Sequence, residues 1–234
     1  MTTEEIKAAV GRRAADDHVR SGMKLGMGTG STAVWSIRRV GELLRSGKIS
    51  DIVAVPTSFQ SELECNAQGI PVRSLNDPEI GGAIDLTIDG ADEVDRGLRL
   101  TKGGGAALLL EKIVAYNSSE LVIVIDNAKR VENLGLSFPI PLEVHPSARI
   151  AVTRGLEERG LGVQLRMAVR KMGPVVTDNG NILLDVTLGS PADPSELEVE
   201  FNLIPGILEN GLFTRCSPIV YVAKPDGVVE QVHR

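Results

Sequence analysis

The feature that most constrains the fold of this 234-residue chain is the alternation of short apolar segments with helical patterns in its first half. The clearest segment is LVIVID at 121–126, which is apolar without a break until its last residue, as expected for a strand covered on both faces. Strands that alternate with helices predict a parallel sheet flanked by helices, and therefore the α/β class. The expected strands are 23–27, 52–55, 86–89 and 121–126, and the expected helices are 1–17, 32–44, 58–68 and 106–116.

The second half of the chain has a different character. After about residue 134 prolines interrupt the pattern, and Asn179-Gly180 lies between two apolar runs, which predicts a hairpin with a type I′ turn. Asp193-Pro194 has the composition of a helix start, with a capping residue before a proline at the first helical position. This half indicates a small α+β second domain. The expected elements of this domain are a helix over 147–159, strands 175–177 and 182–186, and a helix from Pro194. The tail then returns to strand character, at 219–223 and 228–232.

Composition argues against several classes of protein. The net charge of -6 argues against a nucleic-acid partner, which normally requires a basic face. No apolar stretch approaches the roughly 18 residues of a membrane span, and the amino terminus lacks a signal-like apolar region, so neither a membrane partner nor export from the cytoplasm is expected. Cys65 and Cys216 lack the spacing of a zinc site, and the thiols are expected to be buried or inert.

The first candidate site segment is the glycine-rich loop Gly26-Met27-Gly28-Thr29-Gly30-Ser31-Thr32, which follows the first expected strand. Glycines let backbone N–H groups approach a ligand, hydroxyls add donors, and the following helix start adds positive dipole, so the loop suits a phosphate. Its third glycine comes one residue too early for the dinucleotide fingerprint, and it lacks the lysine of a Walker loop. A tight turn with a Ser/Thr helix cap is the alternative.

The second candidate segment is acidic. Asp89 ends the expected strand 86–89, and Gly90 and Ala91 permit a sharp turn that brings Asp92 alongside it. Two neighbouring carboxylates repel each other, so one tends to hold a proton while the other is ionised, which provides an acid and a base. The run lacks the ligand spacing of an EF-hand. A calcium loop and a solvated acidic turn are the alternatives.

The third and fourth candidates are Lys102-Gly103-Gly104-Gly105 and Glu111. Three consecutive glycines are costly in conformational entropy, so contact between this backbone and a ligand explains them better than a passive linker does. Lys102 could offset the charge of an anionic intermediate or a phosphate. Glu111 follows an apolar stretch in the next helix, where partial desolvation would strengthen it as a proton acceptor. A flexible loop and a surface glutamate beside Lys112 are the alternatives.

Four segments taken together resemble the ribose-5-phosphate isomerase A family. They are GMGTGST, TIDGADEVD, KGGGAALLLEK and GPVVTDNGNILLDV, in that order and at the family's spacing. DGADE followed by KGGGAAL-x-x-E is far more specific than any single glycine loop, and the resemblance extends from Ile6 to the final strand. VPTSFQSE, with Thr57 and Ser58, departs from the serine-rich form of many bacterial members.

The resemblance implies a metal-free and cofactor-free aldose–ketose isomerase of the non-oxidative pentose phosphate pathway. Its substrates would be ribose 5-phosphate and ribulose 5-phosphate, small-molecule phosphopentoses interconverted through an enediolate. The family's proton acceptor falls on Glu111, and Asp89, Asp92 and Lys102 are its expected catalytic partners. The implied substrate-binding residues are Thr29, Gly30, Ser31, Thr32, Asp89, Gly90, Ala91, Asp92, Lys102, Gly103, Gly104, Gly105 and Lys129, with Lys7 as a further phosphate contact.

The resemblance also implies an architecture. A Rossmann-like catalytic core would comprise residues 1–134 plus 207–234, and a smaller α+β, ferredoxin-like lid or oligomerisation domain would comprise 135–206. The assembly is expected to be a cytoplasmic homodimer or homotetramer.

Two other functions fit parts of the pattern. A sugar-phosphate sensor would normally carry a helix-turn-helix segment, for which we see neither spare length nor a basic face. A different enzyme on the same scaffold, such as an amino-sugar-phosphate isomerase or an acyl-CoA transferase, would differ in its motifs or would use a glutamate nucleophile in another context.

Overall fold

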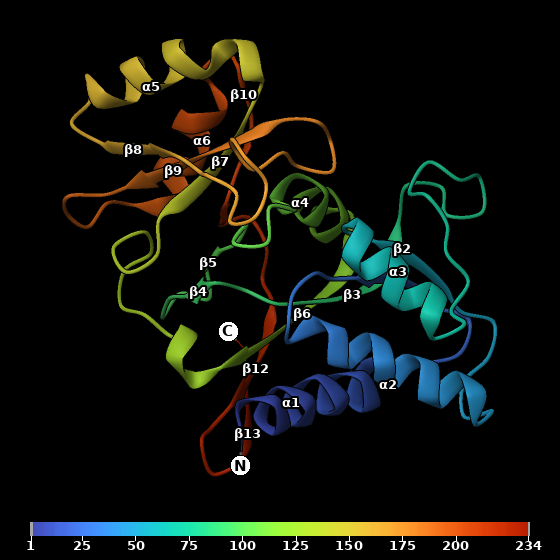
Figure 1. Ribbon diagram of the computed structural model, residues 1–234. Helices are drawn as coiled ribbons and strands as arrows, with labels where there is room; N and C mark the ends of the chain where they lie inside the picture. Colours follow the sequence, from blue (N-terminus) through green and yellow to red (C-terminus); the bar gives the residue numbers. More distant parts are fainter. Residues whose placement is uncertain (1, 234) are drawn as a thin grey trace. The chain divides into compact units, whose positions relative to one another are not determined.

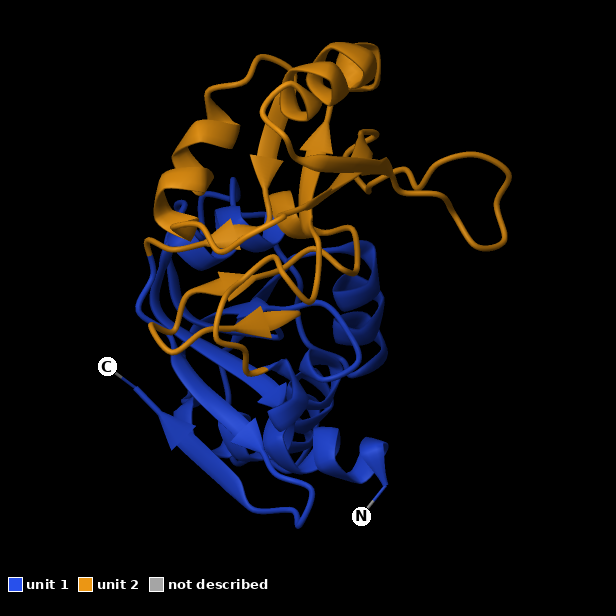
Figure 2. Ribbon diagram, turned by 90° about the vertical axis from the view of Figure 1, so that its left-hand side faces the viewer, with its two compact units in different colours: residues 1–91, 110–129, 216–234 blue, residues 92–109, 130–215 orange. Residues whose placement is uncertain are grey.

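The computed structural model describes residues 2–233, which form two compact units. Unit 1 comprises 1–91, 110–129 and 216–234, and unit 2 comprises 92–109 and 130–215 (Figure 2). Within the described residues, no helix is both long and apolar enough to cross a membrane. Each unit has its own sheet and its own apolar core, so the two are described separately.

Unit 1 is built on a six-stranded sheet with the order β13-β12-β6-β3-β1-β2. All strands run parallel except the edge strand β13. Numbered along the chain, the five parallel strands take the order 2-1-3-4-5, in which ligands bind where the order reverses, at the carboxyl ends of the first and third strands. The predicted α/β class with a Rossmann-like parallel sheet is confirmed. The strands are β1 (Lys24–Met27), β2 (Val53–Pro56), β3 (Ile84–Asp89), β6 (Ser118–Asp126), β12 (Ile219–Ala223) and β13 (Val229–Val232).

Helices cover both faces of this sheet. The helices α1 (Thr3–His18) and α2 (Ala33–Arg45), which lie side by side in Figure 1, pack on the face that contains Ala54. Val53 and Val55 point to the opposite face and pack with Val114 of α4 (Leu108–Tyr116), as the alternation of side chains along a strand requires.

The helix α3 (Phe59–Ala67) follows β2 and contacts α2. Its Cys65 is buried in the core of unit 1, where burial raises the pKa of the thiol to about 12. Cys65 therefore behaves as the inert thiol that the sequence predicted. Cys216 is partly exposed.

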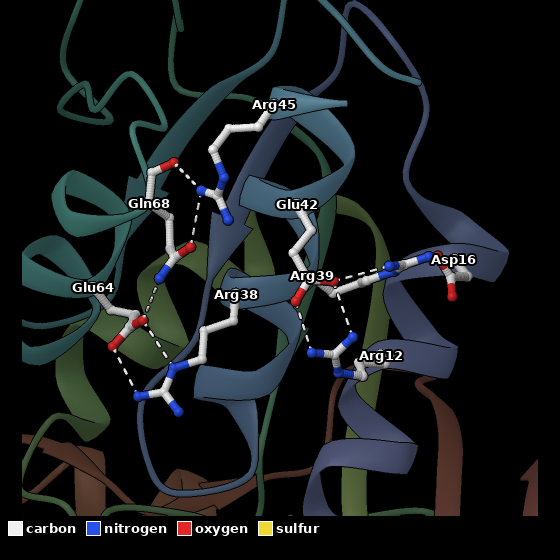
Figure 3. A network of polar contacts seen from close by, with 8 residues as sticks. All are labelled: Arg12, Asp16, Arg38, Arg39, Glu42, Arg45, Glu64 and Gln68. Atoms are coloured by element: carbon white, nitrogen blue, oxygen red, sulfur yellow. Dashed lines mark hydrogen bonds and ion pairs between the residues drawn. The ribbon is translucent and has the colours of Figure 1, made fainter. Parts of the chain in front are cut away.

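Charged side chains connect α1, α2 and α3 at the surface (Figure 3). Glu42 accepts hydrogen bonds from Arg12 at 2.7 Å and from Arg39 at 2.9 Å, and Arg38 donates to Glu64 at 3.0 Å. The hydrogen bond from Arg39, reinforced by Arg12, holds the pKa of Glu42 below its usual range. Partly exposed ion pairs contribute about 0.2–1 kcal/mol each, so the network adds only modestly to the stability that core burial provides.

Unit 2 contains a four-stranded antiparallel sheet with the order β10-β7-β9-β8. Its elements follow the chain order βαββαβ, and the strand order 4-1-3-2 is that of a ferredoxin-like domain. The predicted smaller α+β unit is therefore confirmed. The elements are β7 (Ile140–Val144), the short 3₁₀ helix η2 (Pro146–Ala148), α5 (Arg149–Glu157), β8 (Gly162–Leu165), β9 (Ile182–Thr187), α6 (Pro194–Asn202) and β10 (Ile207–Asn210).

A second, smaller sheet joins distant segments within unit 2. It has the order β11-β5-β4 and consists of β4 (Glu93–Val94), β5 (Leu100–Thr101) and β11 (Leu212–Phe213). Residues 92–109 and 207–215 lie in unit 2, with β10 paired to β7 and β11 paired to β5, whereas the predicted boundaries placed them in the first domain. That the two parts act as separate catalytic and lid domains stays a prediction.

The predicted hairpin around Asn179-Gly180 is wrong in two respects. Residues 175–177 make only an isolated bridge to β9, which pairs instead with β7 and β8. Only Gly180 has a positive φ, of 81°, whereas a type I′ turn needs positive values at both central residues. The fully buried Glu143 of β7 organises the turn instead, because its Oε1 accepts a hydrogen bond from the Asn179 amide at 3.0 Å and others from Thr177 and Asn181.

Candidate active site

The predicted site residues of unit 1 follow three neighbouring parallel strands. The loop 28–32 follows β1, Asp89 ends β3 and residues 90–91 follow it, and Lys129 follows β6 in the short 3₁₀ helix η1 (Asn127–Lys129). The carboxyl ends of parallel strands meet at one edge of a sheet, which is where α/β sheets bind ligands. The other predicted residues are Glu111 in unit 1 and Asp92 and 102–105 in unit 2.

Asp89 holds the loop after β1. Its side chain is fully buried, and its Oδ1 accepts hydrogen bonds from the N–H groups of Thr29 at 3.0 Å and Gly90 at 2.7 Å. Gly28 passes so close that a Cβ there would lie 2.1 Å from Asp89 Oδ1. Glycine at position 28 is therefore required by its close contact with Asp89. The sequence had suggested a close contact with a ligand instead.

A buried group of hydroxyls supports the same loop. The Thr29 hydroxyl donates to Ser58 Oγ at 2.6 Å and lies 2.8 Å from Thr57 Oγ1, and the Gln60 side chain accepts from the Gly30 N–H at 3.0 Å. Sequence reasoning noted Thr57 and Ser58 only as a departure from the family pattern and assigned Gln60 no role. The only local signal there is the capping box at Ser58, which gives no hint of the contact with Thr29.

The outer part of the loop suits an anion. Ser31 is exposed, and the Lys7 ammonium of α1 donates to its Oγ at 2.8 Å. The helix α2 begins directly afterwards, and in the described part of the chain its N-cap Thr32 makes no side-chain cap hydrogen bond, so the Ser/Thr cap alternative is not supported. A helix N-terminus beside an ammonium group favours phosphate binding.

Glu111 lies in α4 and is only 5% exposed, which excludes a surface glutamate. Its neighbour Lys112 is buried too, with Nζ 5.9 Å from the centroid of the Tyr116 ring. A buried carboxylate next to apolar side chains has lost much of its hydration, which is the environment in which a glutamate works well as a proton acceptor.

In unit 2, Asp92 holds the second glycine loop. Its Oδ2 accepts a hydrogen bond from the Gly104 N–H at 2.7 Å, and its own N–H donates to the Thr101 carbonyl at 2.8 Å. A Cβ at Gly104 would lie 2.6 Å from Asp92 Oδ1. Gly103 has a φ of 110°, and a Cβ there would lie 2.8 Å from Leu108 Cδ2, so packing as well as backbone conformation demands glycine.

Lys102 is 3% exposed and is fixed by residues that the sequence did not reveal. Its N–H donates to the Gly211 carbonyl at 2.8 Å, and its Nζ lies 5.7 Å from the centroid of the Phe213 ring. A Cβ at Gly211 would lie 2.2 Å from the Lys102 carbonyl oxygen. The turn after the loop is also unusual, because Ala106 has a φ of 62°, a left-handed conformation that costs a non-glycine residue about 1–2 kcal/mol and is typical of functional sites.

The remaining carboxylates of the acidic run are structural. Glu93 is buried and accepts hydrogen bonds from the Thr101 hydroxyl at 3.1 Å and from the N–H groups of Gly135 at 2.9 Å and Phe138 at 3.0 Å. Asp95 is buried and pairs with an arginine of the same turn at 2.7 Å. The solvated-turn alternative is therefore excluded: Glu93 ties β5 to residues 135–138, and Asp95 closes its own turn.

The chain is similar over its whole length to one family of enzymes. Residues 53–227 match the family model described as ribose 5-phosphate isomerase A (phosphoriboisomerase A). The ribose-5-phosphate isomerase A of Treponema denticola is 48% identical, over 99% of this chain and 100% of its own. Among solved structures, a D-ribose-5-phosphate isomerase in complex with phospho-erythronic acid is 42% identical, with a TM-score of 0.94. Ribose 5-phosphate isomerase A from Methanocaldococcus jannaschii is 40% identical, with a TM-score of 0.92. Each comparison covers 100% of both chains. The resemblance seen in the sequence is thus confirmed: the chain belongs to the ribose 5-phosphate isomerase A family.

Proposed function

We propose that this chain interconverts D-ribose 5-phosphate and D-ribulose 5-phosphate through an enediolate. The family match over the full chain is the observation that carries the proposal. The solved relative with phospho-erythronic acid supports it, because that acid carries a phosphate and a planar anionic carboxylate that stands in for the enediolate group.

We assign phosphate binding to the loop 28–32. The N-terminus of α2, the exposed Ser31 and the Lys7 ammonium 2.8 Å from Ser31 Oγ support this assignment. An anchored phosphate holds the sugar in one geometry, which converts an encounter into an intramolecular reaction. Lys129, after β6 at the same edge of the sheet, is a second cation for the substrate.

Glu111 is the proposed base that removes the C2 proton of the aldose and returns it to C1. Its burial in α4 supports this role, because few water molecules then compete for the proton. A base of this kind accelerates a reaction about 10²–10⁴-fold.

Lys102 and the backbone of 103–105 are the proposed donors to the oxygen that becomes negative in the enediolate. Donors that are fixed before the reaction stabilise such charge without reorganising, and the buried Lys102 is held by Gly211 and Phe213.

Asp89 and Asp92 are proposed to move the proton between the sugar oxygens during ring opening and during the exchange of hydroxyl and carbonyl. Each also orders a glycine loop through hydrogen bonds that an ionised carboxylate accepts.

The direct test is turnover of ribose 5-phosphate by the purified chain in an excess of chelator, with ribulose 5-phosphate as the measured product. We expect turnover without added metal or coenzyme. Failure to form ribulose 5-phosphate would overturn the proposal, and turnover of an amino-sugar phosphate or of a CoA thioester instead would favour one of the other two enzyme classes.

We also propose that the chain works in the cytoplasm as a homodimer or homotetramer, and that residues 135–206 serve association. The exposed apolar side chains of Met167, Val169 and Met172 support this, because such clusters mark association surfaces. Light scattering at micromolar concentration tests it, and a monomeric mass would contradict it.

A further inference from the structure

Arg166, the residue directly after β8, makes contacts that the proposed mechanism does not yet use. Its side chain is 15% exposed and pairs with Asp185 of β9, which is 18% exposed. Nε donates to Asp185 Oδ2 at 2.9 Å and Nη2 donates to Oδ1, so both carboxylate oxygens are engaged. The Arg166 N–H donates to the Leu183 carbonyl at 3.0 Å, which ties its backbone to the sheet. A forked pair of this kind fixes the plane of the guanidinium group.

The remaining nitrogen of the guanidinium reaches the second glycine loop. Nη1 donates to the Gly103 carbonyl at 2.7 Å and to the Gly104 carbonyl at 3.3 Å. Consecutive glycines have many accessible conformations and no side chains with which to pack. Within the turn the Gly103 carbonyl accepts one hydrogen bond, from the Ala106 N–H at 3.0 Å, and Arg166 adds charged donors from outside the loop.

The peptide group between Gly103 and Gly104 is held at both ends. Because a peptide group is planar, fixing the Gly103 carbonyl also fixes the direction of the Gly104 N–H, which donates to Asp92 Oδ2 at 2.7 Å. An unbroken series of hydrogen bonds thus runs within unit 2 from Asp185 through Arg166 and this peptide group to Asp92.

We infer that Arg166, held by Asp185, is a positioning residue for the isomerisation: it sets the orientation of the 103–105 backbone and, through it, of the Asp92 carboxylate. The inference rests on the proposed function, in which Asp92 and this loop act on the substrate. Arg166 acts through them, because it fixes the donors of the loop and the Asp92 carboxylate before the reaction begins.

Two variants and one control separate positioning from general stability. Arg166→Gln removes the charge and the fork, whereas Arg166→Lys keeps the charge but places all its donors on one nitrogen, in place of the three separate nitrogens that reach Asp185 and the loop. The control is Arg99→Gln, because Arg99 is also a partly buried arginine of unit 2, bonded to Asp95 at 2.7 Å and to Asp193 at 3.3 Å, both of which lie outside the glycine loop.

The experiment measures kcat and KM for ribose 5-phosphate, the melting temperature, and amide hydrogen exchange of peptides covering 101–108, on the full chain and all three variants. In both Arg166 variants we expect kcat to fall about tenfold or more with KM little changed, because the phosphate anchor lies on another loop and misplaced groups lower the rate of the chemical step. Exchange over 101–108 should rise in Arg166→Gln. Arg99→Gln should keep kcat within about twofold at a comparable loss of melting temperature.

Wild-type kcat in either Arg166 variant would overturn the inference, as would an equal loss of kcat in Arg99→Gln, which would assign the effect to the stability of unit 2. If the unmodified chain fails to isomerise ribose 5-phosphate, the proposed function is overturned instead. Hydrogen exchange then decides separately whether Arg166 holds the loop: a rise in Arg166→Gln alone supports that contact, and unchanged exchange overturns it.

Discussion

The glycine loop after β1, residues 28–32, and the glycine loop before α4, residues 102–105, are each tied to an aspartate by a backbone N–H, but they differ in what lies beside their glycines. Gly28 lies against the backbone as well as the side chain of the buried Asp89, so part of its surroundings cannot rotate away. Gly104 lies against the end of the Asp92 side chain, and Asp92 and Arg166 hold the peptide group before it by polar contacts. A clash at Gly28 therefore displaces backbone, whereas a clash at Gly104 can be relieved by rotation of a side chain.

The comparison also shows that the aspartates of the DGAD segment have two tasks. Each is assigned to proton transfer, and each anchors one glycine loop, Asp89 through the Thr29 N–H and Asp92 through the Gly104 N–H. A substitution at either position therefore changes both the chemistry and the loop. Substitutions of the glycines test the loops without removing a carboxylate.

The largest effect is expected for Gly28→Ala. The new Cβ would lie 2.1 Å from Asp89 Oδ1 and 2.5 Å from the Asp89 Cα, and a backbone atom cannot rotate away. We expect kcat/KM to fall about 100-fold and the free energy of unfolding to fall by about 1–3 kcal/mol, measured by steady-state kinetics and urea unfolding. Gly155→Ala in α5, where no atom lies within 4 Å of the added Cβ, is the control and should be neutral or stabilising. Equal behaviour of the two variants would show that steric contact does not fix the first loop.

A smaller effect is expected for Gly104→Ala in the second loop. Here the clash is with Asp92 Oδ1 at 2.6 Å, at the end of a side chain that can rotate. The rotation would break the hydrogen bond from the Gly104 N–H, so we expect kcat to fall roughly tenfold, as for the loss of one hydrogen bond to a charged group. A loss as large as that of Gly28→Ala would remove the distinction between the two loops.

The next effect concerns the anion site of the first loop. Lys7→Gln removes the ammonium that donates to Ser31, and we expect KM for ribose 5-phosphate to rise about tenfold with kcat nearly unchanged, because a charge-assisted contact to the phosphate is lost. The exposed Lys48, on the loop after α2, provides the control Lys48→Gln. A fall in kcat without a rise in KM would contradict the assignment of Lys7 to phosphate binding.

The smallest effect is expected outside both loops, at Glu42 of the surface network. Its pKa is lowered by Arg39, so its ionised form stabilises the folded chain above its usual pKa of about 4.3, and that contribution is lost as pH falls through the lower pKa of the folded state. Glu42→Gln should lower the free energy of unfolding by no more than about 1 kcal/mol at neutral pH, with unchanged turnover. Urea unfolding at neutral pH and at pH about 3 checks this. A difference that persists at low pH would mean that packing, and not charge, is responsible.

The sequence predicted the sheet of unit 1 well because the information there is local. The run at 121–126 and the glycine loop after 23–27 each identify a strand or its end without reference to the rest of the chain. In unit 2 the strand β7 was missed because it carries Pro141 although it lies between two other strands, and a proline normally argues against such a strand. The edge strand β8 was missed because each of its residues is at least partly exposed.

The candidate site shows the same difference between residues found from local motifs and residues brought together only by the fold. Asp89, Asp92, Lys102 and Glu111 stand in short motifs, and the combination of these motifs carries the family resemblance that predicts their roles. For Glu111 the residue type and its neighbours alone would have favoured a surface glutamate. Arg166 could not be found in this way, because it reaches the Gly103 carbonyl across 63 residues of chain. The contact between Thr29 and Ser58 was missed for the same reason, since it exists only after β1 and β2 pair.

The most direct test of the account is isomerisation in D₂O, with deuterium at C1 of the ribulose 5-phosphate measured by NMR, for the unmodified chain and for Glu111→Gln. Because the buried Glu111 can return the same proton to C1, deuterium at C1 is expected in only part of the product of the unmodified chain. Turnover should fall by about 100-fold or more in the variant. Near-normal turnover by Glu111→Gln would contradict the account.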